Sequence, residues 1–287
     1  MFAQWAAVGL PWPENVTAVI AGIDIGGSTT DAVLLDGAGL RMVTIELTDP
    51  VAAAAGALGK LVSQCGLRLD QITSVAATGA GARGLPDSLL GRPVIKVDEF
   101  TAIGVGGSTL AGRESALVVS LGTGTAIVSV RGGKIEHVGG TGVGGGTLLG
   151  LARHLLGVSR IDTLEAMAVR GDLSRINLTV GDIAGGPLGD LPPASTASNF
   201  GKVGSDPAPE DKALAIINMI AEVVMVLSLS SARACGQKDI VLTGKLTRTI
   251  QFARRFSHME PMFNRGFIIP QHAAYATAIG AARAQRL

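Results

Sequence analysis

Short apolar runs rich in β-branched residues alternate with polar turns and longer helical stretches along the chain. Three such runs between residues 17 and 47, separated in part by turn residues at 36–39, predict strands that form a meander. The Ala- and Leu-rich stretch at 51–65 predicts a helix that ends at Gly66. A strand, a glycine turn and another strand recur from Ser115, which predicts a second lobe built like the first, with a cleft between them.

The recurrence of this pattern divides the chain. We expect an N-terminal lobe of residues 1–112, closed by a C-terminal helix at 272–287, and a C-terminal lobe of residues 113–271. Residues 177–202 are rich in Gly, Pro, Ser and Asp, and we expect them to form a surface excursion over the cleft. Such an excursion would serve as a lid or as a contact between two copies of the chain.

One apolar stretch, residues 213–232, is nearly long enough to span a bilayer. Asn218 and Glu222 argue against a membrane span, because an ionisable side chain is costly in the bilayer interior. We therefore predict a central helix buried between the two lobes. Glu210 and Asp211 suit the positive end of its dipole.

The chain is apolar and nearly neutral. Of its 287 residues, 47% are hydrophobic and 16% charged, which fits a large α/β core whose strands are buried on both faces. The formal net charge of +1 gives no reason to expect nucleic acid or a membrane as a partner. Cys65 and Cys235 are isolated, which argues against disulfides and metal knuckles and favours the cytoplasm. The apolar arm at 1–13 has no basic segment or cleavage site, so we interpret it as an arm or packing strap.

Three glycine-rich segments follow apolar runs, at 22–31, 120–125 and 139–147. Glycine lets the backbone approach a ligand closely and turn its N–H groups toward it. One such segment means little, but three in series predict that a polyphosphate is held from several sides. Asp24 lies in the first segment within an apolar strand, where an unpaired carboxylate is expensive, so we expect it to be functional.

These segments carry a resemblance to a known superfamily. Residues 22–31 and 120–125 resemble the two phosphate motifs of the actin/hexokinase/Hsp70 ATPases, residues 240–244 their adenosine motif, and residues 272–281 their second connecting helix. The resemblance implies an α/β fold of the two-lobed, actin-like ATPase type (ribonuclease H-like), with a mixed sheet in each lobe.

Within this superfamily the chain resembles the type II pantothenate kinases, through residues 138–150, 180–185 and 197–202. The likeness extends over residues 19–282 by motif placement. It implies that ATP and Mg²⁺ are used to phosphorylate pantothenate to 4′-phosphopantothenate, the first step of coenzyme A biosynthesis. It also implies a homodimer, with CoA or acyl-CoA as an inhibitor.

The resemblance assigns roles to individual residues. Glu99 matches the catalytic base, and Asp24 the residue near the γ-phosphate and Mg²⁺. The positions that match nucleotide contacts are Gly26, Gly27, Ser28, Thr29, Thr123, Gly144, Gly145, Gly146, Thr147 and Gly244. The positions assigned to the acceptor are His137, Gly140 and Thr141. Read from the residues alone, Asp98 and Glu99 also fit an N-cap and a first-turn acid of a helix.

Two departures from the family pattern keep other functions open. Asp31 stands where the family usually has a lysine, and His137 where it usually has an arginine beside the pantothenate. A kinase for another small hydroxyl compound and an inactive nucleotide- or CoA-binding paralogue are therefore alternatives. A third is an ATPase switch like the activators of acyl-CoA dehydratases. Those proteins bind an iron–sulfur cluster through cysteines, for which Cys65 and Cys235 have no nearby partners in sequence.

Overall fold

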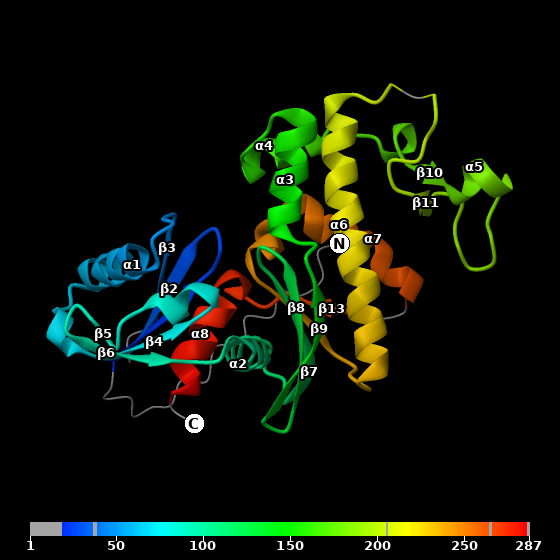
Figure 1. The fold of residues 1–287 in the computed structure, drawn as a ribbon. Coiled ribbons are helices and arrows are strands. Elements are labelled where there is room, and N and C mark those ends of the chain that lie inside the picture. Colours follow the sequence, from blue (N-terminus) through cyan, green and yellow to red (C-terminus); the bar gives the residue numbers. More distant parts are fainter. Residues whose placement is uncertain (1–18, 37–38, 205, 264–265, 286–287) are drawn as a thin grey trace.

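The computed structural model describes residues 19–36, 39–204, 206–263 and 266–285, so the arm at 1–13 lies outside the described residues. Two sheets organise the molecule (Figure 1), with strand orders β3-β2-β1-β4-β6-β5 and β13-β12-β7-β8-β9. The first contains β1 (Val19–Ile25), β2 (Thr30–Asp36), β3 (Gly39–Ile45), β4 (Ile72–Thr78), β5 (Ser88–Leu89) and β6 (Arg92–Lys96). The second contains β7 (Ser115–Leu121), β8 (Thr125–Arg131), β9 (Lys134–Thr141), β12 (Ile240–Thr243) and β13 (Phe267–Ile268).

Both sheets have the same topology at their centre. Strands β1, β2 and β3 form an antiparallel meander, with β4 parallel to β1 on its other side. Strands β7, β8 and β9 repeat the meander, with β12 parallel to β7. The predicted meander and the predicted second lobe are therefore confirmed, and each sheet is mixed.

Helices cover both faces of each sheet. They are α1 (Pro50–Cys65), α2 (Glu99–Ala111), α3 (Gly145–Leu156), α4 (Ile161–Ala168), α5 (Val180–Ala184), α6 (Pro209–Ala234), α7 (Ile250–Phe263) and α8 (Ala276–Ala284). The short 3₁₀ turns are η1 (Leu69–Gln71), η2 (Ala80–Gly84), η3 (Leu173–Arg175), η4 (Lys245–Arg248) and η5 (Ala273–Tyr275). Helices α1 and α8 lie on opposite faces of the first sheet, while α2 packs on one face of the second sheet and α6 on the other.

The apolar helix α6 is a core helix of the second lobe. It is the one helix of the described chain that is long and apolar enough to cross a membrane, and 67% of its most apolar window is buried inside the protein. It packs with strand and helix residues such as Leu117, Ile127 and Phe252. The expectation that this helix lies between the lobes is wrong, because the small-residue helices α2 and α8 occupy that position.

The excursion at 177–202 is attached to α6, on the side away from the first lobe (Figure 1), rather than over the cleft. It contains α5 and a small sheet of β10 (Leu178–Thr179) and β11 (Thr196–Ser198). Asn199 donates from Nδ2 to Glu222 at 2.7 Å, and Asn218 donates to the same carboxylate at 3.0 Å. The polar residues within the apolar helix thus hold this excursion in place.

The lobes meet through helices α2 and α8, which approach each other closely because glycines face backbone atoms. A Cβ added at Gly280 would lie 1.8 Å from the carbonyl oxygen of Ala102, and one at Gly106 would lie 1.9 Å from that of Ala276. No side chain fits at either position without separating the helices. The contact between the lobes therefore depends on the absence of these two side chains.

We expect Gly280→Ala to destabilise the protein by about 1–3 kcal/mol or more, since the added methyl group forces α2 and α8 apart. Gly59→Ala on α1 is the matched control, because the space around Gly59 is open. At that position the alanine should stabilise the protein by about 0.5–1 kcal/mol, because it reduces the backbone freedom of the unfolded chain. Denaturant unfolding of both variants measures the difference, and equal stabilities would contradict this account of the interface.

Candidate active site

Two glycine-containing turns, one from each lobe, face each other where the lobes meet. Turn 26–29 joins β1 to β2 and is closed by the N–H of Gly26, which donates to the carbonyl of Thr29 at 3.0 Å. Turn 122–124 joins β7 to β8 in the same way in the second lobe. The hydroxyls of Ser28 and Thr123 lie 3.5 Å apart. The repeated topology therefore brings the first two predicted phosphate segments together.

The third glycine-rich segment holds the second turn in place. The N–H groups of Gly145 and Gly146 donate to the carbonyls of Gly122 and Thr123, each at 2.8 Å. A Cβ at Gly144 would lie 2.7 Å from the backbone of Gly124. The N–H groups of Gly145 and Gly146 are therefore bonded to the protein's own backbone. From the sequence we had expected the N–H groups of the glycine-rich segments to face a ligand.

Thr147 also has a local structural use. Its hydroxyl donates to the carbonyl of Gly142 at 2.8 Å and accepts from the N–H of Gly144 at 3.3 Å, at the start of α3. Contacts of residues 144–147 with a nucleotide stay a prediction.

Asp24 lies near the end of β1, directly opposite Asp31 of β2. Directly opposed residues of an antiparallel pair project from the same face, so the two carboxylates are neighbours. Burial, followed by the negative charges of Asp31 and Glu99, raises the pKa of Asp24 from 3.8 to about 7, while Lys245 opposes the rise. The carboxylate is thus in a place where a bound cation would strongly favour its ionised form.

Glu99 is the first residue of α2. Asp98 caps this helix, since its Oδ1 accepts from the N–H of Thr101 at 2.8 Å. Partial burial is the main cause that raises the pKa of Glu99 above its usual value, Asp98 adds to it, and Arg83 of η2 acts in the opposite direction. The charge of Glu99 also raises the pKa of Asp24, so the two carboxylates lie within electrostatic reach of each other.

His137 lies on β9 and stacks on Phe100, the neighbour of Glu99, with ring centroids 3.9 Å apart. Farther along the strand, a Cβ at Gly140 would lie 2.5 Å from the carbonyl oxygen of Thr125, so this glycine allows close strand packing. The hydroxyl of Thr141 accepts from the N–H of Val143 at 3.2 Å. The structure thus places one of the three predicted acceptor positions, His137, beside the start of α2, where its ring stacks on that of Phe100.

Gly244 ends β12 with φ of +88°, and a Cβ there would lie 2.5 Å from the carbonyl oxygen of Leu121. This backbone conformation favours glycine, and it starts the turn η4. The first residue of η4, Lys245, extends to the other lobe, where its Nζ lies 3.1 Å from Oδ1 of Asp31 and donates to the hydroxyl of Thr29.

The sequence analysis missed Lys245. Two signals could have found it. One is its place directly after the glycine of the adenosine-like segment, and the other is the acidic residue at 31 in an apolar strand, which needs a cationic partner.

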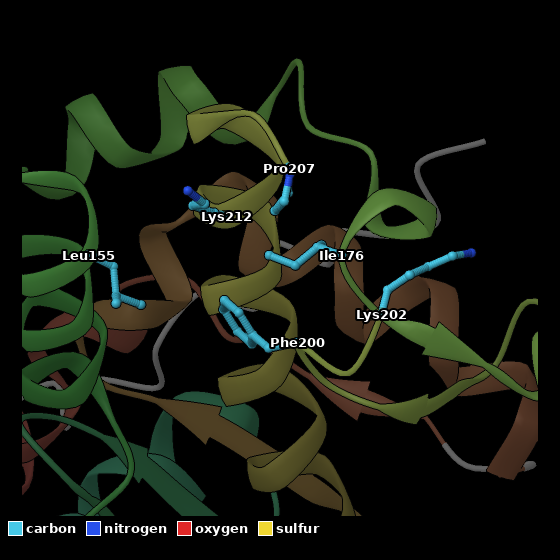
Figure 2. Close-up of a pocket in the computed structure, with 6 residues that line it drawn as sticks. All are labelled: Leu155, Ile176, Phe200, Lys202, Pro207 and Lys212. Carbon is cyan, nitrogen blue, oxygen red and sulfur yellow. The ribbon is translucent and has the colours of Figure 1, made fainter. Parts of the chain in front are cut away.

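A cavity of about 270 Å³ lies elsewhere in the second lobe (Figure 2). Its lining residues are Leu155, Ile176, Phe200, Lys202, Pro207 and Lys212. Lys202 extends away from the other lining side chains, and its Nζ pairs with Asp182 at 2.8 Å. This cavity is separate from the two turns and shares none of their residues.

Comparisons with solved structures agree with this architecture. The activator of the 2-hydroxyisocaproyl-CoA dehydratase from Clostridium difficile, solved with bound ADPNP, is similar with a TM-score of 0.65, 17% identity and 92% coverage of both chains. A ROK family glucokinase from Streptomyces griseus has a TM-score of 0.61 and 14% identity, over 93% of this chain and 99% of that one. At such identities the likeness shows the fold alone, and it confirms the two-lobed, actin-like ATPase fold.

Sequence comparisons are more specific. The family model Fumble matches residues 115–284. A type II pantothenate kinase of Oceanobacillus iheyensis is 34% identical over 222 residues, which make up 74% of this chain and 82% of the relative. On these grounds the chain belongs to the type II pantothenate kinase family.

Proposed function

We propose that this protein phosphorylates pantothenate with ATP and forms 4′-phosphopantothenate, the first step of coenzyme A biosynthesis. The observation that carries the proposal is the apposition of turns 26–29 and 122–124, with Asp24 and Glu99 at the same junction. Transfer of a phosphoryl group requires positioning, charge neutralisation and a proton acceptor, and this junction offers candidates for each. The relative from O. iheyensis carries the corresponding name, type II pantothenate kinase.

The residues present fit a magnesium nucleotide. Turn 26–29 would hold the β- and γ-phosphates, and the carboxylate of Asp24 would hold Mg²⁺. Mg²⁺ in nucleotide sites is commonly held by one or two carboxylates together with phosphate oxygens, and Asp24 offers such a carboxylate beside turn 26–29. When bound, Mg²⁺ neutralises charge on the transferring phosphoryl group.

Glu99 would accept the proton of the acceptor hydroxyl. Its raised pKa brings it nearer to neutrality, where a carboxylate is a better base for an alcohol. The positive charge of Arg83 acts against that rise in pKa. The position of Glu99 at the start of α2, beside Phe100 and His137, would place the acceptor between the base and β9.

The finer features implied by the family resemblance belong to the same proposal. We propose a homodimer, in which the exposed side chains of Val223 and Val226 on α6 contribute to the contact. We further propose that CoA or acyl-CoA inhibits the enzyme, and that it acts in the cytoplasm. We also propose a lobe division near residue 112. The two sheets divide between β6 and β7, and α2, which lies between these strands, connects them because it packs on the second sheet and against α8.

An assay of ADP release tests the proposal against its alternatives. Wild-type protein should release ADP with pantothenate, in a panel that also contains pantetheine, pantoate and sugars. Activity only with another acceptor would overturn the substrate assignment, and binding of ATP without turnover on any acceptor would favour an inactive paralogue. An iron-containing, coloured preparation would favour the activator-type alternative instead.

The variant Glu99→Gln should lower kcat by about 10²–10⁴-fold, because the amide cannot accept the proton. Binding of a non-hydrolysable ATP analogue should be retained. Glu114→Gln is the control, since Glu114 is an exposed glutamate outside the junction. Equal kcat values for the two variants would exclude Glu99 as the base.

Substitutions at His137 test the acceptor side. We expect His137→Ala to raise KM for pantothenate several-fold and leave KM for ATP unchanged. His137→Arg should lower KM for pantothenate, because a guanidinium binds a carboxylate through two hydrogen bonds. His154→Ala, on the exposed surface of α3, is the control. A change confined to KM for ATP would contradict this assignment.

Removal of the charge at Asp24 should make stability less dependent on pH. Because its folded pKa of about 7 exceeds the unfolded value of 3.8, ionisation destabilises the folded state increasingly between these values and fully above the upper one. Each pKa unit corresponds to about 1.4 kcal/mol, so Asp24→Asn should stabilise the folded protein by at most about 4 kcal/mol at about pH 8. At about pH 4 the stability of the same variant should differ little from that of wild type.

Denaturant unfolding at both pH values, without Mg²⁺, measures this effect. Asp87→Asn serves as the control, because Asp87 is an exposed aspartate that belongs to neither turn 26–29 nor turn 122–124. A stabilisation by Asp24→Asn that is larger at the acidic pH would show that the folded pKa is not raised.

A further inference from the structure

A lysine of the second lobe reaches the phosphate turn of the first. Lys245 begins η4, which Gly244 separates from β12, while Thr29 ends turn 26–29 and Asp31 lies near the start of β2. The ammonium group is 3.1 Å from Oδ1 of Asp31 and also donates to the hydroxyl of Thr29. It therefore adjoins the last residue of turn 26–29, and this interaction joins the lobes.

Asp31 is arranged to hold that ammonium group. Its side chain is nearly buried, and Oδ1 also accepts from the hydroxyl of Thr44 at 2.6 Å. The hydroxyl of Thr44 in turn lies 3.2 Å from that of Tyr275, which precedes α8. A buried carboxylate is strongly unfavourable without a cation, so Lys245 is kept at this place.

Lys245 retains the capacity to bind a ligand. An ammonium group has three N–H donors. Asp31 and Thr29 use two of them within the described chain, which leaves one for an oxygen atom of a ligand. The side chain is 31% exposed, so it is accessible from the junction. Lysine commonly binds phosphate as a point charge.

On the basis of the proposed kinase function, we propose that Lys245 is a phosphate-binding residue supplied by the second lobe, with Asp31 as its positioning residue. The cation lies at turn 26–29 only when the lobes are together, since its backbone belongs to the second lobe. Phosphate binding and the contact between the lobes are thereby coupled. The competing interpretation is a purely structural ion pair between the lobes.

Calorimetric titration with a non-hydrolysable ATP analogue and Mg²⁺ separates these interpretations. Lys245→Met should weaken analogue binding by about tenfold or more, because a hydrogen bond to a charged phosphate is lost. Arg248→Met is the matched control: it removes a positive charge from the same turn, but Arg248 is exposed and faces solvent. It should bind the analogue like wild type. In activity assays KM for ATP should rise, while KM for pantothenate stays unchanged.

A second variant separates the two effects of Lys245→Met, which are the loss of the cation and the loss of the ion-pair partner of Asp31. Asp31→Lys combined with Lys245→Met moves the ammonium group to β2 and leaves no ion pair between the two positions. If Lys245 binds phosphate, the double variant should regain much of the analogue affinity. A double variant no better than Lys245→Met would overturn the phosphate-binding role.

The remaining outcomes also decide the matter. Equal analogue affinity in wild type and Lys245→Met would overturn the inference and leave the kinase function intact. Failure of the wild-type protein to bind the analogue would overturn both. Circular dichroism of each variant verifies that affinity is compared between folded proteins.

Discussion

The concentration of negative charge where the lobes meet is the constraint around which the rest of the site is arranged. The register of β1 and β2 places Asp24 directly opposite Asp31, and the charge of Glu99 acts at the same place. Burial disfavours the charged form of Asp24, and the like charges of Asp31 and Glu99 add to this, so the raised pKa of Asp24 expresses both costs. Lys245 offsets part of these costs. A metal ion with a polyphosphate would offset the rest, so the same charges that destabilise the protein alone favour its ligand.

The scaffold that creates this constraint is simple and repeated. In each lobe a meander and one parallel strand produce a turn at the same position, and helices α2 and α8 bring the two turns together. Proteins of other kinds share this scaffold at low identity, including a dehydratase activator and a glucokinase. The chemistry must therefore depend on the side chains at the turns rather than on the fold.

What the sequence could predict follows from the range of each interaction. The meander, the helix that ends at Gly66 and the cap at Asp98 depend on neighbours within a few residues, and all three are confirmed. The position of α6 was predicted wrongly, because an apolar helix shows that it is buried but not which sheet buries it. The contact of Lys245 with Asp31 joins distant parts of the chain, so the sequence can signal that Asp31 needs a cation but not which residue supplies it. Likewise, the sequence could not show that Gly145 donates its N–H to protein.

The two charged positions at the junction are best understood together. A lysine at 31, where related kinases usually have one, would lie opposite Asp24 within a single sheet, and its charge would be present whatever the arrangement of the lobes. In this chain that position is acidic, and the cation comes from the end of β12. The charge balance at turn 26–29 then depends on the contact between the lobes, as it would not with a lysine on β2. Because separation of the lobes would remove the ammonium group of Lys245 from the carboxylate of Asp31, the ion pair itself favours the closed arrangement in which phosphate could bind.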